Sequence, residues 1–146
     1  MGRRRKAREF ALQMLFQIDL TDASPQLVFD QFWSGQEAKP DEREFAERLV
    51  QGVVDQRREL DRYIVGAADN WRVERMATVD RNILRVAIHE LLDDEQTPPP
   101  VIIDEAIAVA KRFGSGESGS FINGVLDSIR RQLDKERLDG TGAPQP

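Results

Sequence analysis

Residues 3–18 read RRRKAREFALQMLFQI, and this stretch decides the fold prediction. Its apolar side chains recur every three or four residues, which is the spacing of one face of an α-helix. They are Ala7, Phe10, Ala11, Met14, Leu15 and Ile18. The sequence therefore predicts a first helix that begins with a basic cluster and buries one apolar face against a core.

Prolines and capping residues mark the starts of the next two helices. Ser24 offers a hydroxyl cap and Pro25 has the fixed φ angle of a first helical turn, so a short helix is expected up to about Ser34. Pro40, followed by two acidic residues, begins a third helical region. Gly52 within that region leaves one long helix or two as alternatives.

The second half of the chain has the same helical spacing. Trp71 lies in a predicted break, and Thr78 is expected to cap the helix that follows it. The polar run at 93–96 and the proline triplet at 98–100 should end that helix, because proline donates no backbone hydrogen bond and restricts the residue before it. Two further helices are expected, one over residues 101–112 and one over residues 121–133.

These patterns predict an all-α protein. No run alternates between apolar and polar residues for long, so strands are not expected. We expect about seven helices packed as two small helical bundles. They form a single domain over residues 1–136, with an N-terminal half at about 1–66 and a C-terminal half at about 72–136. The Gly- and Pro-containing tail, residues 137–146, is expected to be disordered.

Composition excludes several classes of function. The chain has no cysteine and one histidine, His89, so thiolate metal sites, histidine metal clusters and a cysteine–histidine catalytic pair are not expected. No apolar run of about 18 residues predicts a membrane span. The basic start lacks the apolar segment of a secretory signal. The sequence therefore predicts a cytoplasmic protein without a cofactor, a metal or a catalytic centre.

The basic cluster is the strongest indication of a ligand. The whole chain has a formal charge of −5 and its first eight residues carry +5, so the remaining 138 residues carry −10. Such concentrated positive charge usually contacts a polyanion. Helical spacing predicts that Arg4, Arg5 and Arg8 share one surface. Single-stranded RNA suits this chain better than duplex DNA, because no second basic element has the spacing of a recognition helix.

A glycine-rich loop offers a second possible contact with phosphate. Residues 114–119 read GSGESG and match the dinucleotide-binding pattern GxGxxG, but they follow a predicted helix where that fingerprint requires a strand. One interpretation is a flexible loop between helices that caps the last helix through Ser118 or Ser120. A loop whose backbone amides approach an RNA phosphate, beside the N-terminus of that helix, fits better. Phe121 lies where the loop meets that helix, and core packing and base stacking remain equal alternatives for it.

Two further residues are interpreted structurally. Gly124 lies inside the last predicted helix, where glycine costs about 1 kcal/mol relative to alanine, so close approach of another backbone is expected there. His89 follows Arg81 and Arg85 at four-residue spacing and has no metal-ligand partner, so a surface or packing role is expected.

Four segments, in this order and spacing, resemble the NusB family of transcription antitermination factors over all but about the last ten residues. They read RRKARE with ALQ, DRNILRVAIHEL, DEAIAVAKRF and FINGVLD, and they begin at Arg4, Asp80, Asp104 and Phe121. The resemblance implies a fold of two small helical bundles. It also implies that the chain binds boxA RNA together with NusE, a ribosomal protein. That assembly helps RNA polymerase to read through terminators, notably in ribosomal RNA operons.

The same resemblance assigns roles to individual residues. It implies RNA contacts in the basic helix, the loop and the start of the last helix, at Arg4, Arg5, Lys6, Arg8, Gln13, Glu117, Ser118, Ser120 and Phe121. It implies a NusE-facing surface at Glu74, Asp80, Arg81 and Leu84. The chain departs from the family pattern at Phe16 and His89, where tyrosine is usual, and at Asp104, where asparagine is usual. Ser120 also lacks the basic side chain often found there.

Two alternatives remain open from the sequence. The same helical module could serve as the RNA-binding part of a ribosomal RNA methyltransferase, although the length leaves no room for a cofactor-binding domain. A helical interaction scaffold, with a homodimer formed through exposed apolar faces, is the other alternative.

Overall fold

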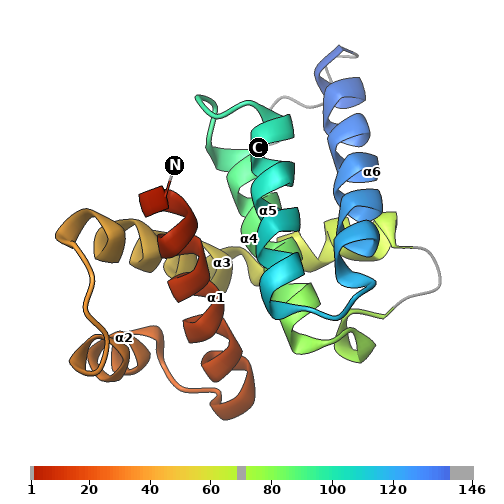
Figure 1. Cartoon of the computed structure of the whole chain (residues 1–146). Helices are drawn as coiled ribbons and strands as arrows, with labels where there is room; N and C mark the ends of the chain where they lie inside the picture. Colours follow the sequence, from red (N-terminus) through yellow and green to blue (C-terminus); the bar gives the residue numbers. More distant parts are fainter. Residues whose placement is uncertain (1, 69–71, 139–146) are drawn as a thin grey trace.

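The computed structural model describes residues 2–68 and 72–138, and Figure 1 shows that this part of the chain is all-α. It contains six α-helices and one short 3-10 helix. They are α1 (Gly2–Thr21), α2 (Pro25–Ser34), α3 (Pro40–Ala67), η1 (Val73–Arg75), α4 (Thr78–Asp93), α5 (Pro99–Phe113) and α6 (Ser118–Leu138). None of the described helices is long and apolar enough to cross a membrane. The all-α prediction is confirmed, and the predicted tail lies outside the described residues from residue 139 onward.

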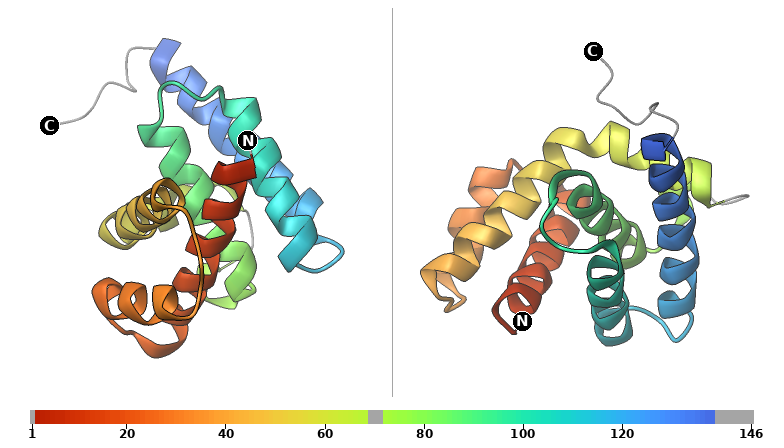
Figure 2. Two further views of the ribbon diagram at one scale, coloured as in Figure 1. Left: turned by 60° about the vertical axis from the view of Figure 1, so that its left-hand side comes forward. Right: turned by 90° about the horizontal axis from the view of Figure 1, so that it is seen from above.

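The helices form two groups that share one long helix. Helices α1 and α2 pack with the first part of α3, while α4, α5 and α6 pack with one another (Figure 1). Figure 2 shows α3 running from the first group to α6 of the second. Helix α1 also packs against α4 and α5, which brings the basic N-terminal helix beside the last turn of α5. Trp71, in the predicted break after α3, lies outside the described residues.

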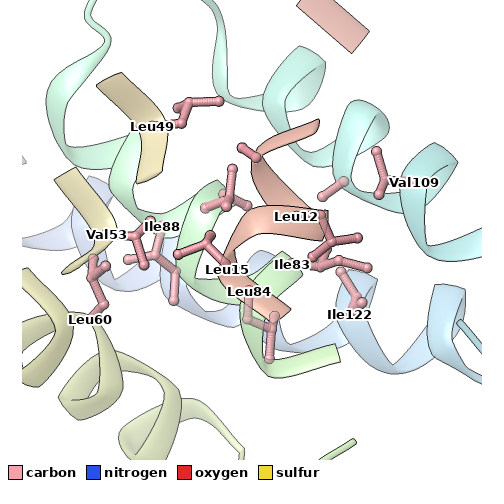
Figure 3. Close-up of a cluster of buried hydrophobic side chains, with 14 of the residues drawn as sticks. Leu12, Leu15, Leu49, Val53, Leu60, Ile83, Leu84, Ile88, Val109 and Ile122 are labelled. Atoms are coloured by element: carbon pink, nitrogen blue, oxygen red, sulfur yellow. The ribbon is translucent and has the colours of Figure 1, made fainter. Parts of the chain in front are cut away.

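One cluster of buried apolar side chains extends through both groups (Figure 3). Met14 of α1, Leu60 of α3, Ile88 of α4 and Ile122 of α6 are all essentially inaccessible to solvent. Since each buried side chain of this size stabilises the fold by about 1.5–3 kcal/mol, helix packing holds α1 in place. The amphipathic spacing read from the sequence therefore corresponds to the observed core.

The first turn between helices follows from three local interactions. Helix α1 ends at Thr21, and Asp22 has a φ of 58°, a left-handed conformation that Asp tolerates better than most side chains. The chain then turns into α2, where Ser24 Oγ accepts a hydrogen bond from the Leu27 amide over 3.3 Å and Pro25 occupies the first turn. The predicted cap and first-turn proline are confirmed.

Helix α3 is one continuous helix of 28 residues, which resolves the alternative left open at Gly52. At its start, Glu42 accepts a hydrogen bond from the Lys39 amide over 2.9 Å. Gly52 lies directly beneath the His89 ring of α4, and a Cβ atom there would overlap the ring. The absence of a side chain therefore allows α3 and α4 to approach each other.

Three local predictions are wrong. Thr78 is the first residue of α4, and the N-cap position belongs to Ala77, which makes no side-chain cap. Helix α4 ends at Asp93, where the predicted polar run begins, but the proline triplet does not stop it. The triplet instead starts α5, because Pro99 and Pro100 occupy the first turn, where no intrahelical amide donor is needed. Gly124 has nothing within 4 Å of the position of a Cβ atom, so no other backbone approaches it.

Candidate nucleic-acid interface

The basic start of α1 divides into exposed and buried cations. The side chains of Arg4 and Arg5 are 57% and 50% exposed, and Lys6 is exposed as well. Arg8, one helical turn after Arg4, is only 6% exposed. Because their side chains are exposed, Arg4, Arg5 and Lys6 point away from the core. The predicted surface shared by Arg4, Arg5 and Arg8 does not form, because Arg8 turns inward.

Arg8 lies between two buried glutamates of the second helical group. Its Nε and Nη2 atoms donate to Glu90 Oε1 of α4 over 2.9 and 2.8 Å, and Nη1 lies 3.5 Å from Glu105 Oε1 of α5. Arg5 Nε donates to the same Glu105 over 3.2 Å. Burial raises the pKa of Glu90 above its ordinary value, and the hydrogen bond from Arg8 opposes that rise. Arg8 thus joins α1 to α4 and α5.

A second ion pair joins the middle of α1 to the end of α5. Arg112 Nη1 lies 3.2 Å from Glu9 Oε1, and the arginine side chain is 64% exposed while the glutamate is nearly buried. Gln13 is exposed on the next turn of α1, beside Phe113. The exposed cations of α1 therefore continue, through Arg112, toward the glycine loop that follows α5.

The glycine loop is held in place by Ser118, the first residue of α6. Its buried hydroxyl accepts a hydrogen bond from the Ser115 amide over 2.9 Å and donates one to Asp80 Oδ1 over 2.7 Å. A side chain at Gly114 would overlap Ser118, so glycine is required there. The hydroxyl bonds back into the loop rather than to the amides of α6, so the predicted capping role of Ser118 is wrong.

The remaining predicted RNA residues lie around the same loop. Glu117 and Ser120 are exposed, and Ser120 Oγ lies 3.5 Å from the carbonyl oxygen of Glu117, three residues earlier. Phe121 is half-buried and packs against the edge of the core. Core packing is therefore one role of Phe121, and base stacking stays a prediction.

The predicted partner residues separate into accessible and buried positions. Glu74 is exposed, while Asp80 and Arg81 are half-buried. Leu84 is completely buried in the core, so the structure does not bring it to a partner surface. Arg81 Nε donates to Asp19 Oδ2 over 3.1 Å, which fixes the arginine against the end of α1.

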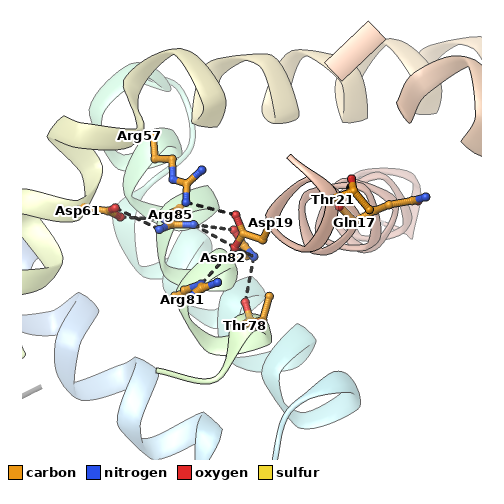
Figure 4. A network of polar contacts seen from close by, with 9 residues as sticks. All are labelled: Gln17, Asp19, Thr21, Arg57, Asp61, Thr78, Arg81, Asn82 and Arg85. Atoms are coloured by element: carbon orange, nitrogen blue, oxygen red, sulfur yellow. Dashed lines mark hydrogen bonds and ion pairs between the residues drawn. The ribbon is translucent and has the colours of Figure 1, made fainter. Parts of the chain in front are cut away.

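Asp19 is the centre of a polar network that links three helices (Figure 4). Besides Arg81, its carboxylate lies 3.3 Å from Arg85 Nη1 and 3.5 Å from Arg57 Nη2 of α3. Arg85 also donates to Asp61 over 2.8 Å and is itself buried. The predicted face of Arg81, Arg85 and His89 is therefore mostly internal.

An apolar groove adjoins Arg81 and Asp80 at the junction of α1, α2, α4 and α5. Phe16 and Leu20 on its rim are 39% and 66% exposed, and Val79 precedes Asp80 in α4. The other lining side chains are Leu12, Gln13, Gln17, Thr21, Phe32 and Phe113. Exposed apolar side chains gathered around a groove are typical of a protein-binding surface. This surface, which the residue-by-residue prediction missed, is visible in the sequence only as unexplained apolar residues on the outer face of α1.

His89 belongs to no cluster of metal-ligating side chains among the described residues. Within residues 2–68 and 72–138, no three His, Asp or Glu side chains are grouped to hold a metal ion. His89 Nδ1 lies 2.8 Å from Gln56 Oε1 and 3.5 Å from Asp93 Oδ2, and the ring packs on Gly52. These contacts give His89 the packing role that the sequence predicts.

Comparison with known proteins places this arrangement in a family. Residues 5–131 match the NusB family. The chain belongs to the NusB family. A relative from Koribacter versatilis, named transcription antitermination protein NusB, is 49% identical over 137 residues, which cover 93% of this chain and 94% of the relative. The NusB family is one of transcription antitermination factors and not of enzymes.

Solved NusB structures have the same fold. The structure of T. maritima NusB matches with a TM-score of 0.79 and 33% sequence identity, over 88% of this chain and 91% of that chain. A structure of the antitermination factors NusB and NusE in complex with double-stranded RNA matches with a TM-score of 0.80 and 28% identity, over 90% of this chain and 98% of that chain. The NusB-like fold predicted from the sequence is confirmed.

Proposed function

We propose that this NusB-family chain binds boxA-containing RNA together with a NusE-type ribosomal protein. It thereby joins the antitermination complex of RNA polymerase and promotes read-through, notably in ribosomal RNA operons. Family membership supports the transcriptional role. The solved assembly of a NusB relative with NusE and RNA supports both ligands.

The observation that carries the RNA part is the continuity of one exposed face. Arg5 opens this face on α1 and Gln13 extends it two turns further along the same helical row, while the exposed Arg4 and Lys6 flank Arg5 at the tip of the helix. The pair between Glu9 and Arg112 connects it to the end of α5 and the glycine loop. We call this surface the RNA face. Its cations attract phosphate, and its loop amides and Phe121 supply contacts that attraction alone does not.

Arg8 serves the RNA face from within. Its guanidinium is buried and paired with Glu90 and Glu105, so it is unsuited to hold a phosphate as well. By fixing α1 against α4 and α5, it orients the exposed Arg4 and Lys6. We assign Arg8 a positioning role, in place of the direct RNA contact that the resemblance implies.

The proposed protein partner contacts the apolar groove beside the RNA face. Phe16 and Leu20 supply exposed apolar area, and Glu74, Asp80 and Arg81 supply charge nearby. Gln13 and Phe113 line this groove at the edge of the RNA face. A partner seated there adjoins the bound RNA, so the two ligands can stabilise each other.

Fluorescence anisotropy with a labelled single-stranded RNA that carries a boxA element tests the RNA part. We expect the Arg4→Gln, Lys6→Gln double variant to lose affinity, while the matched variant Arg58→Gln, Lys135→Gln, which changes exposed cations elsewhere, retains it. About four neutralised phosphates give a log–log salt slope near −3. Equal affinity of the two double variants, or a wild-type slope near zero, contradicts RNA binding at this face. A duplex of the same RNA distinguishes single-strand from double-strand binding.

Isothermal titration calorimetry with a purified NusE-type ribosomal protein tests the partner surface. We expect Leu20→Asp to abolish the binding heat, because it buries a charge in the apolar groove. The control Val65→Asp introduces the same charge at a side chain that is 58% exposed on α3 and should bind as wild type. Loss of self-association in Leu20→Asp, with partner binding intact, favours a homodimer at this groove.

A further inference from the structure

The arginines of the RNA face, and the buried Arg8 beneath it, are all paired with carboxylates of the protein itself. The pairs are Arg4 with Asp94 at 3.9 Å, Arg5 and Arg8 with Glu105, and Arg112 with Glu9. Among the described residues, Lys6 and Lys111 are the cations of this region without such a partner. Lys6 lies 5.6 Å from the centre of the Phe10 ring, whereas Lys111 lies at the other end of the face, on the last turn of α5.

Lys111 lines a groove between α5, the glycine loop and the start of α6, which we call the glycine groove. The groove is lined by Ile107 and Lys111 of α5, by Gly114, Ser115 and Gly116 of the loop, and by Gly119, Ser120 and Asn123 of α6. No lining residue carries a carboxylate, although the chain as a whole is acidic. An ammonium, a hydroxyl and a carboxamide are gathered there, and each can donate a hydrogen bond to an anion.

Glycine at position 119 shapes this groove around the lysine. The Cγ and Cε atoms of Lys111 lie 3.9 and 4.0 Å from the position that a Cβ atom would take at Gly119. The lysine stem therefore packs along the start of α6, in the wall of the glycine groove. Ser120 on the same turn is neutral, so Lys111 supplies the only charge among the lining residues.

We propose that Lys111 holds a backbone phosphate of the bound RNA in the glycine groove. This inference rests on the proposed RNA-binding function and deepens it, because it adds a phosphate contact at the end of the RNA face where Ser120 offers no charge. The unpaired ammonium costs less to engage than the arginines, since no internal carboxylate competes with the phosphate for it. The contact positions the RNA backbone and leaves the bases of the RNA to other groups.

The test compares Lys111→Gln with the control Lys135→Gln, in which an exposed lysine near the far end of α6 loses the same charge. The probe is the labelled boxA-containing single-stranded RNA, titrated over a range of salt concentrations. We expect Lys111→Gln to weaken binding by about five- to tenfold and to make the log–log salt slope shallower by about 0.7, the value for one phosphate. The control should match wild type in both quantities.

A second variant separates a lost contact from a disturbed loop. Adding Ser120→Lys to Lys111→Gln returns one cation to the glycine groove, and we expect it to restore most of the affinity and the slope. If Lys111→Gln binds like the control while wild type binds RNA with a steep slope, Lys111 holds no phosphate and the RNA-binding proposal still stands. If wild type binds this RNA neither alone nor with the NusE-type protein, the function itself is wrong.

Discussion

Ser118 Oγ donates a hydrogen bond to Asp80 Oδ1 over 2.7 Å, although the two residues are 38 positions apart. Ser118 lies at the loop end of the RNA face, and Asp80 lies beside the apolar groove proposed for the protein partner. The serine hydroxyl is buried and also accepts a hydrogen bond from the Ser115 amide. One side chain therefore connects the glycine loop to the partner surface, which gives the two proposed sites a physical link.

A double-mutant cycle on Ser118→Ala and Asp80→Ala measures that link. We expect Ser118→Ala to reduce the free energy of unfolding by about 1–3 kcal/mol, because it removes the two hydrogen bonds that the buried Ser118 hydroxyl makes to the Ser115 amide and to Asp80. The coupling energy between the two changes should be about 1 kcal/mol in urea denaturation. If the losses of unfolding free energy in the two single variants add up to the loss in the double variant within about 0.3 kcal/mol, the hydrogen bond contributes no stability.

Local sequence signals predicted the helices well where the deciding interactions lie within one turn. Ser24 and Pro25 begin α2 as expected because both act through their own backbone neighbours. Pro99 was misinterpreted as a stop because the same property, a missing amide donor, suits a first helical turn. The direction of that effect depends on the φ and ψ angles of the preceding chain, which spacing alone does not specify.

The candidate site was predicted by segment but not by side chain. Arg8 has the same local pattern as Arg4 and Arg5, and its partners Glu90 and Glu105 are 82 and 97 residues away in the sequence. Leu84 was expected on a partner surface and lies in the core for a similar reason, since helices pack on both sides of α4. Long-range partners decide burial, and single-helix periodicity does not identify them.

Two glycines should respond in opposite directions to the same substitution. Gly52→Ala introduces a methyl group into the His89 ring, and we expect it to cost about 1–3 kcal/mol of unfolding free energy. Gly124→Ala meets open space and removes helix-interior glycine, so it should stabilise by up to about 1 kcal/mol. Thermal denaturation of both variants measures the difference. A stabilising Gly52→Ala would mean that α3 and α4 separate without cost.

Glu90 gives the fold a predictable dependence on pH. Burial raises its pKa above the ordinary value of 4.5, so the folded state holds the proton more tightly than the unfolded state. Its contribution to stability is therefore complete below pH 4.5 and declines as the pH rises through the raised pKa. We expect the stability of wild type relative to Glu90→Gln to fall as the pH increases from about 4 to 7. Urea denaturation across this range measures it, and a difference that rises with pH would contradict the assignment.

The ion pair between Arg5 and Glu105 should limit the affinity of the RNA face for RNA. Glu105 is buried and holds the Arg5 guanidinium, so an RNA phosphate must share that guanidinium with an internal carboxylate. Glu105→Gln keeps the shape of the side chain, retains the pair of Arg8 with Glu90 and removes one negative charge beneath the RNA face. We expect binding of the boxA-containing RNA to tighten by about two- to fivefold at low salt and the gain to shrink as salt is added. The exposed Glu59→Gln on α3 makes the same change in net charge and should leave the affinity unaltered. An equal gain in both variants would assign the effect to net charge rather than to competition for Arg5.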